Sequence, residues 1–356
     1  MRAPDRQSPA EPAPRSPAPF VSVLIPVRNE APYIGANLAA ALRQDYPSHC
    51  FEVIVADGRS TDGTRPIVES IAASEPRLRL VDNPDRIVAA GLNRALAVAR
   101  GNVIVRLDGH CEYPADYLRR VVELRAATGA ANAGGVLEPI GTTYVQRAIC
   151  AALASRIGIG GAALRARAIS GAVREVDAVH GGCWTAETLR EAGPFDEEMV
   201  RNQDDEMSFR LRREGGRVMQ ASDLRVRYVV RDRWGKLFLQ FAQYGYWKVR
   251  LVRRYPRQAS LRHLMPALFV LVWFASSVAA PFSARAAWAV AGLSLAYLAG
   301  IAAATAVPAI RSSPWLWPGA TLALALIHFG YGCGFLAGLV RAPSGSGEGI
   351  FSRLNR

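Results

Sequence analysis

The sequence predicts an α/β domain with a mostly parallel sheet, followed by helices that cross a membrane. Two observations predict this architecture. Over the first part of the chain, apolar runs of strand length alternate with helical patterns, as they do in βαβ units. After residue 262, ionisable side chains nearly disappear, and three apolar stretches each reach the roughly 20 residues that a bilayer crossing needs.

The chain begins with a stretch that predicts no folded element. Residues 1–19 are rich in Pro, Ala and Ser and lack the apolar core of a signal peptide, so we expect a disordered tail. Without an export signal, residues 20–262 are expected to stay in the cytoplasm, anchored to the inner (plasma) membrane. The five cysteines have no CxxC spacing, which fits reduced thiols in that compartment.

Four apolar runs are typical of buried parallel strands, and helical spacing separates them. The expected strands are residues 22–28, 51–57, 78–82 and 103–108, and the expected helices are residues 32–43, 62–75 and 88–100. Ligands of parallel sheets bind at the carboxyl ends of the strands. We therefore expect residues 26–29, Asp57, Asp82 and Asp108 to meet at one edge, where a cation or hydrogen-bond donors must relieve the repulsion between the aspartates.

The fourth strand ends in "VRLDGHC" (residues 105–111), which offers two polar groups two positions apart. Alone, Asp108 and His110 are as typical of a turn as of a cation site. The turn after the first strand, in "VLIPVRNEAPYI", lacks the GxGxxG loop of dinucleotide sites. A nucleotide therefore needs a different phosphate-binding arrangement.

Positive charge is concentrated ahead of the first apolar stretch. The chain has 43 Lys and Arg against 30 Asp and Glu, a formal net charge of +13. The residues that gather there are Arg250, Arg253, Arg254, Arg257 and Arg262. Arginine in this position marks the cytoplasmic end of a span and attracts the headgroups of membrane lipids. No aromatic RNA-binding motif or zinc-finger spacing is present, so nucleic acid is not an expected partner.

Four segments, in order, resemble glycosyltransferase family 2, a group of inverting enzymes. They are "VSVLIPVRNE" (21–30), "VIVADGRSTDGT" (53–64), "RLDGHCEYP" (106–114) and the run from "GGCW" to "EGGRV" (181–218). The resemblance implies the GT-A fold, which is Rossmann-like, over residues 20–231. Within the family, the Asp-x-His variant, the "QDDE" segment and the C-terminal apolar stretches are most similar to membrane-anchored glucosyltransferases of succinoglycan-type exopolysaccharide assembly.

The resemblance implies that the donor is a nucleotide diphosphate sugar, with a UDP-sugar expected. The residues that it places around the donor are Pro26, Val27, Arg28, Glu30, Asp57, Arg86, Asn93 and Asp108. Asp57 would accept the uracil N3–H, although it could instead stabilise the turn at Gly58. Arg86 would meet phosphate charge, and Asn93 could equally serve in helix packing.

Asp108 and His110 stand where the family has its Asp-x-Asp motif, so the resemblance implies that they hold a divalent cation against the diphosphate. Histidine replaces the second aspartate of the motif. An imidazole nitrogen suits Mn²⁺ better than Mg²⁺, which favours manganese. A surface histidine in a turn is the alternative for His110.

The segment "QDDE" corresponds to the family's base motif and makes Asp204 the catalytic base that deprotonates the acceptor. Asp205 is the alternative, because consecutive helical residues point about 100° apart and only one can face the sugar. Glu206 and Arg210 are four apart and are expected to form an ion pair.

The remaining acceptor-binding candidates are Gly181, Gly182, Trp184, Asp205, Arg233 and Trp234. Trp184, after two glycines, is expected to be an aromatic platform for a sugar ring. Arg233 and Trp234 resemble the end of the Q-x-x-R-W motif of processive synthases. Val230 stands where that motif has Gln, so single addition is favoured over processive synthesis.

Residues 232–262 combine basic charge with an aromatic and aliphatic stripe, which predicts an amphipathic helix at the membrane surface. Residues 263–340 form a membrane region of about three spans, and residues 341–356 a tail. Three spans would put the tail outside, where its arginines are unfavourable, and a re-entrant or interfacial segment would remove this conflict. Residues 147–167 could contact the bilayer or a lipid-linked acceptor, or form a mobile acceptor loop.

Together these features predict a membrane-bound inverting glycosyltransferase that acts on a lipid-linked saccharide acceptor in cell-surface polysaccharide synthesis. Other polysaccharide-assembly proteins are further candidate partners. Two alternatives remain at this point: a polyprenyl-phosphate glycosyltransferase and a catalytically silent membrane scaffold of the same fold.

Overall fold

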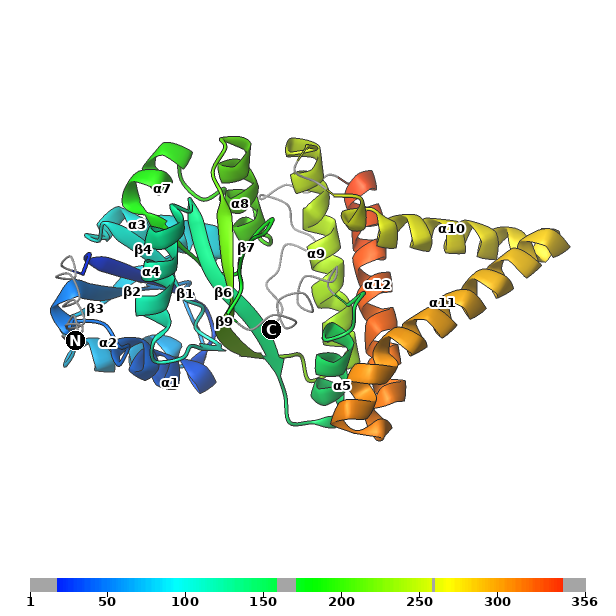
Figure 1. The fold of residues 1–356 in the computed structure, drawn as a ribbon, viewed down its shortest axis with the longest axis horizontal. Helices are drawn as coiled ribbons and strands as arrows, with labels where there is room; N and C mark the ends of the chain where they lie inside the picture. The colour runs from blue at the N-terminus through cyan, green and yellow to red at the C-terminus, as the bar shows by residue number, and fades with distance from the viewer. Residues whose placement is uncertain (1–17, 159–170, 258–259, 342–356) are drawn as a thin grey trace, which may run out of the picture.

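The computed structural model describes residues 18–158, 171–257 and 260–341. Nearly all of the tails predicted at residues 1–19 and 341–356, and the second half of the segment at residues 147–167, lie outside these described residues. The described residues form an α/β domain joined to apolar helices (Figure 1).

The domain begins with the alternating strands and helices that the hydrophobic pattern predicted. The strands are β1 (Val21–Val27), β2 (Phe51–Asp57), β3 (Leu78–Asp82), β4 (Val103–Arg106), β5 (Cys111–Glu112), β6 (Asn132–Ile140), β7 (Val173–Glu175), β8 (Gly182–Thr185) and β9 (Val218–Val229). The helices of this part are α1 (Ala31–Leu42), α2 (Thr64–Ala72), α3 (Val88–Val98), α4 (Tyr117–Thr128), α5 (Tyr144–Leu153), α7 (Ala186–Ala192) and α8 (Gln203–Arg213). All four expected strands and all three expected helices are present, within three residues of their predicted ends.

The strands make one mixed sheet in the order β3-β2-β1-β4-β8-β6-β9-β5, with β7 beside β9. The first four strands pair in parallel, as predicted. Strand β8 then runs antiparallel to both β4 and β6. This reversal brings the segment before β8 to the carboxyl end of β4, which places two distant parts of the sequence at one sheet edge.

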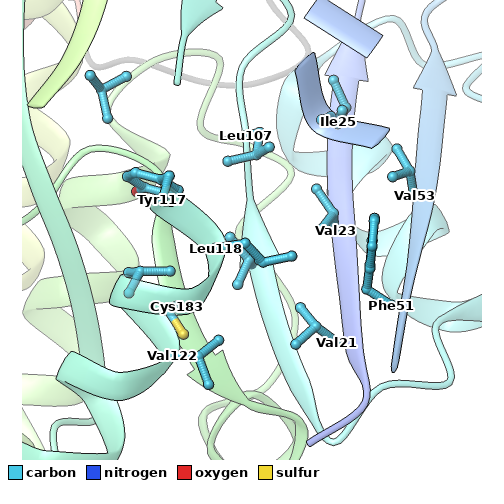
Figure 2. Close-up of a cluster of buried hydrophobic side chains, with 14 of the residues drawn as sticks. Val21, Val23, Ile25, Phe51, Val53, Leu107, Tyr117, Leu118, Val122 and Cys183 are labelled. Carbon is cyan, nitrogen blue, oxygen red and sulfur yellow. The ribbon is translucent and has the colours of Figure 1, made fainter. Parts of the chain in front are cut away.

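Both faces of β1 are buried, which explains its uninterrupted apolar sequence. Val21, Val23 and Ile25 belong to one buried cluster with Leu118 and Val122 of helix α4, and Leu118 lies beside Val21 and Val23 (Figure 2). The alternate residue Leu24 belongs to a second cluster, with side chains from α3, α7 and α8. Because successive side chains of a strand point to opposite faces, one strand contributes to both cores.

Four long helices follow the domain. They are α9 (Trp234–Arg254), α10 (Met265–Ala279), α11 (Ala284–Ser312) and α12 (Trp317–Val340). Three helical segments among the described residues are long and apolar enough to cross a membrane, namely Met265–Phe282, Ala284–Ser312 and Pro314–Val340. They coincide with the three predicted apolar stretches. Figure 1 shows α10 and α11 projecting away from the sheet, while α9 and α12 run across their base.

The stripe on α9 has a different role from the one expected. It was predicted to face lipid, but Leu237 and Phe241 pack against Ile327 and neighbouring residues of α12. Nearer the end of α9, Val249 and Val252 pack against Phe335 of α12. The amphipathic pattern is therefore satisfied by a helix from the same chain, because an apolar partner covers such a stripe as well as a lipid surface does.

Candidate active site

Two carboxylates from distant segments meet beside the end of β4. Asp108 follows β4, and Asp204 lies in the first turn of α8. The side chains of Arg106 and His180 lie between them. The Nε of Arg106 donates to Asp108 Oδ1 at 3.0 Å, and its Nη1 pairs with Asp204 Oδ1. His180 Nε2 lies 3.0 Å from Asp108 Oδ2, and its Nδ1 lies 3.6 Å from Asp204 Oδ2.

The backbone around Gly181 and Gly182 makes this convergence possible. Arg106 on β4 is the pairing partner of Gly182 on β8, so the residue before the two glycines arrives beside β4. Gly181 and Gly182 have φ values of 67° and 139°, which L residues rarely adopt. A Cβ on Gly182 would also overlap the ring of Trp184. The two glycines thus serve the turn that delivers His180.

Burial disfavours charge on each of these groups, and the neighbouring charges decide the balance. Against the effect of burial, Arg106 and His180 hold the pKa of Asp108 well below its usual range. Burial also opposes a charged imidazole, yet Asp108 raises the pKa of His180 well above its usual value. Burial raises the pKa of Asp204, and Arg106 and His180 offset only part of that rise. Asp204 is therefore the more basic of the two carboxylates.

One cluster among the described residues could hold a metal ion, and it differs from the predicted pair. Ligand atoms of Asp108, Cys111 and His180 all lie within 4.8 Å of one another. His110 is outside this cluster, and its Nδ1 lies 3.6 Å from Glu30 Oε1. Burial lowers the pKa of His110 to about 4, which leaves the neutral imidazole that a metal ligand requires. Burial raises the pKa of the Cys111 thiol, so this group is the weakest ligand of the set.

These groups fit a divalent cation by their donor types. A carboxylate with one or two imidazoles suits Mn²⁺ and other transition metals, whereas Mg²⁺ prefers oxygen ligands. The low pKa of Asp108 favours its ionised carboxylate, which now pairs with Arg106. A divalent cation carries more charge than the guanidinium and could take its place beside this carboxylate. Asp108, Cys111 and His180 therefore form a possible metal site, which adds His180 to the groups that the sequence predicted.

A cavity joins this site to the apolar helices. Its polar part is lined by Pro26, Val27, Arg28, Glu30, Arg86, Arg106, Asp108, His110, His180, Asp204 and Asp205. Its apolar part is lined by Ile149, Leu153, Phe241, Phe269, Tyr297, Ile327 and Tyr331. Most of the predicted donor-site residues therefore share one cavity with both candidate bases.

Two predicted donor-site residues have other roles. Asp57 is fully buried, its carboxylate accepts bonds from Ser60, and it lies 3.6 Å from Arg65, which also pairs with Asp82. Asp57 thus stabilises the turn after β2, which is the alternative role considered for it, and its contact with a nucleobase stays a prediction. Asn93 bonds both backbone polar groups of Phe195 and lies away from the cavity, so it anchors a loop.

The structure contradicts one acceptor-site prediction and gives no support to two others. Trp184 is only 1% exposed and packs edge-on against Phe195, so it cannot present a face to a sugar. Arg233 is exposed and Trp234 packs against the apolar helices, and neither lines the cavity. Trp184 and Trp234 pack against other side chains and Arg233 faces solvent, and a sequence motif alone does not reveal these environments.

Asp204 and Asp205 are distinguished by their partners. Asp204 faces Arg106 and His180 beside Asp108, whereas Asp205 pairs with Lys248 on α9. Glu206 and Arg210 form the expected ion pair at 2.8 Å. Of the two, only Asp204 is held beside Asp108.

Arg106 and His180 are absent from the sequence-based site. A signal existed for Arg106, because a single cation inside the apolar run "VIVRLD" must find a buried anion. A weaker signal existed for His180, which directly precedes the two glycines that marked a close backbone approach.

Similarity to known proteins identifies the family. A profile of glycosyl transferase family 2 matches residues 22–150. The succinoglycan biosynthesis protein ExoA of Rhizobium meliloti is 32% identical over 259 residues, which cover 72% of this chain and 77% of that protein. The chain belongs to glycosyltransferase family 2. It is accordingly a glycosyltransferase, and its relatives include an exopolysaccharide biosynthesis protein.

Two further relatives extend the comparison. The dolichyl N-acetyl-alpha-D-glucosaminyl phosphate 3-beta-D-2,3-diacetamido-2,3-dideoxy-beta-D-glucuronosyltransferase of Methanococcus voltae is 24% identical over 243 residues, covering 66% of this chain and 74% of that protein. Among solved structures, the mannosyltransferase PcManGT from Pyrobaculum calidifontis, in complex with GDP-Man and Mn²⁺, matches with a TM-score of 0.56 and 23% identity over 91% of this chain and 90% of that one. The shared architecture is the GT-A fold that the resemblance implied.

Proposed function

We propose that this glycosyltransferase moves a sugar from a nucleotide diphosphate sugar, expected to be a UDP-sugar, to a lipid-linked saccharide at the cytoplasmic face of the inner membrane. The observation that carries this proposal is the cavity that connects Asp204 and Asp108 with an apolar lining between α9, α10, α11 and α12. A saccharide attached to a lipid needs both environments at once. The name of the Methanococcus voltae relative, which includes a dolichyl phosphate, points to the same class of acceptor.

In the proposed reaction, Asp204 takes the proton from the acceptor hydroxyl as that oxygen attacks the anomeric carbon. Its Oδ1 pairs with Arg106, whereas its Oδ2 lies 3.6 Å from His180 Nδ1, so Oδ2 is the less tightly held oxygen and the one that would accept the proton. The Arg106 guanidinium fixes the carboxylate in place, and the raised pKa of Asp204 favours proton uptake. Inversion needs this one carboxylate and no covalent sugar intermediate.

On the donor side, Asp108 and His110 would hold the divalent cation, with His180 joining them after losing its proton. Such a cation neutralises the charge that develops on the departing nucleoside diphosphate. Arg28 and Arg86, which line the same cavity, would meet the phosphates. The imidazole ligands favour Mn²⁺ over Mg²⁺.

The test is nucleotide-sugar turnover by the detergent-solubilised protein with Mn²⁺ and a membrane lipid extract. General-base removal typically costs 10²–10⁴-fold, so we expect a loss of about that size in kcat for Asp204→Asn. Asp205→Asn should cost far less, and Asp45→Asn, the same change at an exposed residue on the opposite side of the sheet from α8, should cost nothing. Equal losses in Asp204→Asn and Asp205→Asn would overturn the assignment of the base.

The cation site has a separate test. Mn²⁺ affinity is measured by titration calorimetry on wild type, His110→Ala and His180→Ala. A weaker affinity in His110→Ala supports the motif-based pair, while a loss confined to His180→Ala would transfer the site to the Asp108, Cys111 and His180 cluster. Turnover with polyprenyl phosphate in place of the lipid extract, undiminished in Asp204→Asn, would instead favour a phosphate acceptor, which needs less help from a base.

A further inference from the structure

The three apolar helices differ in what covers them. In the most apolar 18-residue stretch of α10 and of α11, 11% of the residues are buried by the rest of the protein. In α12 the share is 44%. Large apolar side chains point outward along α10 and α11, among them Leu268, Phe274, Val278, Trp288 and Leu295. Such surfaces require a lipid environment. Helix α12 has already buried much of its surface against protein.

Helix α12 contacts α5, the segment after α5, and α9 along its length. Near its start, Gly319 packs on Ala148 of α5. In its middle, His328 Nε2 lies 3.1 Å from the carbonyl oxygen of Ile157. At its end, the carbonyl oxygen of Leu339 accepts a bond from Arg253 of α9 at 3.2 Å.

Three glycines in α12 bring it into backbone contact with α9. Gly330, Gly334 and Gly338 lie on one face, and a Cβ on each would meet the carbonyl oxygens of Phe238, Ala242 and Tyr246, respectively. The residue numbers rise together in steps of four on both helices. The two helices therefore run side by side in the same direction.

Helix α9 cannot be immersed in the bilayer, because ion pairs attach it to the catalytic domain. Lys248 pairs with Asp205, and Arg250 pairs with Glu198. The Asn202 side chain also donates to the Tyr244 carbonyl at 3.1 Å. A charged side chain near the centre of a membrane helix costs about 2.5–3.5 kcal/mol even on the mildest scale. Since α9 stays at the membrane surface, its parallel neighbour α12 stays there too.

We propose that α12 lies along the membrane surface rather than across the bilayer, and that the α10–α11 hairpin alone is inserted. The hairpin projects from the base that α9 and α12 form (Figure 1). Its segments of 18 and 29 residues extend about 27 Å and 43 Å, so the first nearly matches and the second exceeds the roughly 30 Å hydrocarbon core. Trp315 and Trp317, exposed at the start of α12, suit the headgroup region.

This arrangement puts residue 341 on the same side of the membrane as the catalytic domain. Arg262, Arg311 and Arg341 then all lie at the base of the hairpin, with Arg285 at its tip, a distribution that follows the positive-inside rule. Three spans would instead place Arg341 with the tip, and would carry α9 and its ion pairs into the bilayer.

The test is the sidedness of single cysteines in the full-length protein in cells. Cys50, Cys150 and Cys333 are first changed to serine, and cysteine is then introduced by Ser74→Cys in the domain, Arg285→Cys at the tip or Arg341→Cys after α12. A membrane-impermeant maleimide is applied before and after permeabilisation, and labelling after permeabilisation shows that each site is reachable.

We expect the cysteine at 341 to be labelled under the same condition as that at 74, and the tip cysteine under the opposite one. Labelling of 341 together with the tip would show that α12 spans the bilayer. Labelling of all three from one side would show that the hairpin is not inserted. Fusions of alkaline phosphatase and of green fluorescent protein after residue 341 repeat the assignment without cysteines, and neither assay depends on the proposed transfer reaction.

Discussion

At the scale of single residues, the site depends on buried Arg106 and partly buried His180, which hold two carboxylates side by side. Arg106 and His180 each contact both Asp108 and Asp204. Two carboxylates in one pocket repel each other, and one of them would take up a proton without this compensation. The planar guanidinium suits the task because its separate N–H groups reach both partners at once.

Arg106→Met tests this dependence. The substitution leaves two buried carboxylates with half of their compensation, and breaking a buried ion pair from one side costs about 3–5 kcal/mol. We expect a loss of that size in the free energy of unfolding of the solubilised protein, measured by denaturant titration. The matched control Arg119→Met removes a more exposed cation with surface partners and should change it by less than about 1 kcal/mol. Equal effects of the two substitutions would contradict the role given to Arg106.

Glu52 provides a pH-dependent prediction away from the site. Burial alone would raise its pKa, but hydrogen bonds from Arg100 and Ser22 hold it below the usual 4.5. A carboxyl group whose pKa is lowered by folding stabilises the fold above its unfolded pKa and loses that contribution as the pH falls. Stability should therefore decline below about pH 4.5, and Glu52→Gln should weaken both the stability at pH 7 and this decline. Unfolding midpoints from pH 7 to pH 3 check this, with exposed Glu123→Gln as the control that should match wild type.

The residue scale also shows what the sequence could and could not predict. Strand-end residues such as Asp108 were predictable, because a parallel sheet sends its carboxyl ends to one edge. Trp184 was misassigned because the same aromatic ring serves a core or a sugar, and only its 1% exposure decides between them. His180 was missed because it joins the site through the antiparallel strand β8, and that pairing is a long-range property.

At the scale of secondary-structure elements, the contact between α9 and α12 unites the two parts of the chain. The stripe on α9 predicted an apolar partner but could not say whether lipid or protein would supply it. The decisive signal lay in "GYGCGFLAG", whose glycines at 330, 334 and 338 recur every four residues. Small residues at that spacing allow two helix backbones to approach closely.

Gly334→Ala tests this contact. A Cβ there would overlap the carbonyl oxygen of Ala242, and backbone on both helices leaves no room to yield. We expect a clearly lower thermal unfolding midpoint in detergent, since overpacking costs about 1–3 kcal/mol. Gly292→Ala in α11 is the matched control, because nothing lies within 4 Å of its added Cβ and alanine favours a helix by roughly 1 kcal/mol over glycine. A midpoint unchanged in both variants would show that the helices are not in close contact.

At the scale of the whole molecule, the cavity lies where the GT-A domain meets the apolar helices. The polar lining comes from strand ends and the start of α8, and the apolar lining comes from α5, α9, α10, α11 and α12. The sequence predicted both parts but not their junction, because the junction depends on how α9 and α12 pack against the α/β domain. A lipid-linked acceptor placed there would have its sugar near Asp204 and its chain between the helices.

Ile327→Trp examines whether the apolar part of the cavity receives the lipid chain. Ile327 is 2% exposed and lines the cavity, so a larger ring there occupies space that the chain would need. We expect KM for a long-chain lipid-linked acceptor to rise at least tenfold, with kcat and the KM for the nucleotide sugar little changed. KM for a short-chain, water-soluble acceptor should stay close to that of wild type, because such an acceptor uses only the polar end. Leu295→Trp, at a position 72% exposed on α11, is the matched control for a bulky ring among the apolar helices. If Ile327→Trp raises KM equally for short and long acceptors, the chain does not bind in this part of the cavity.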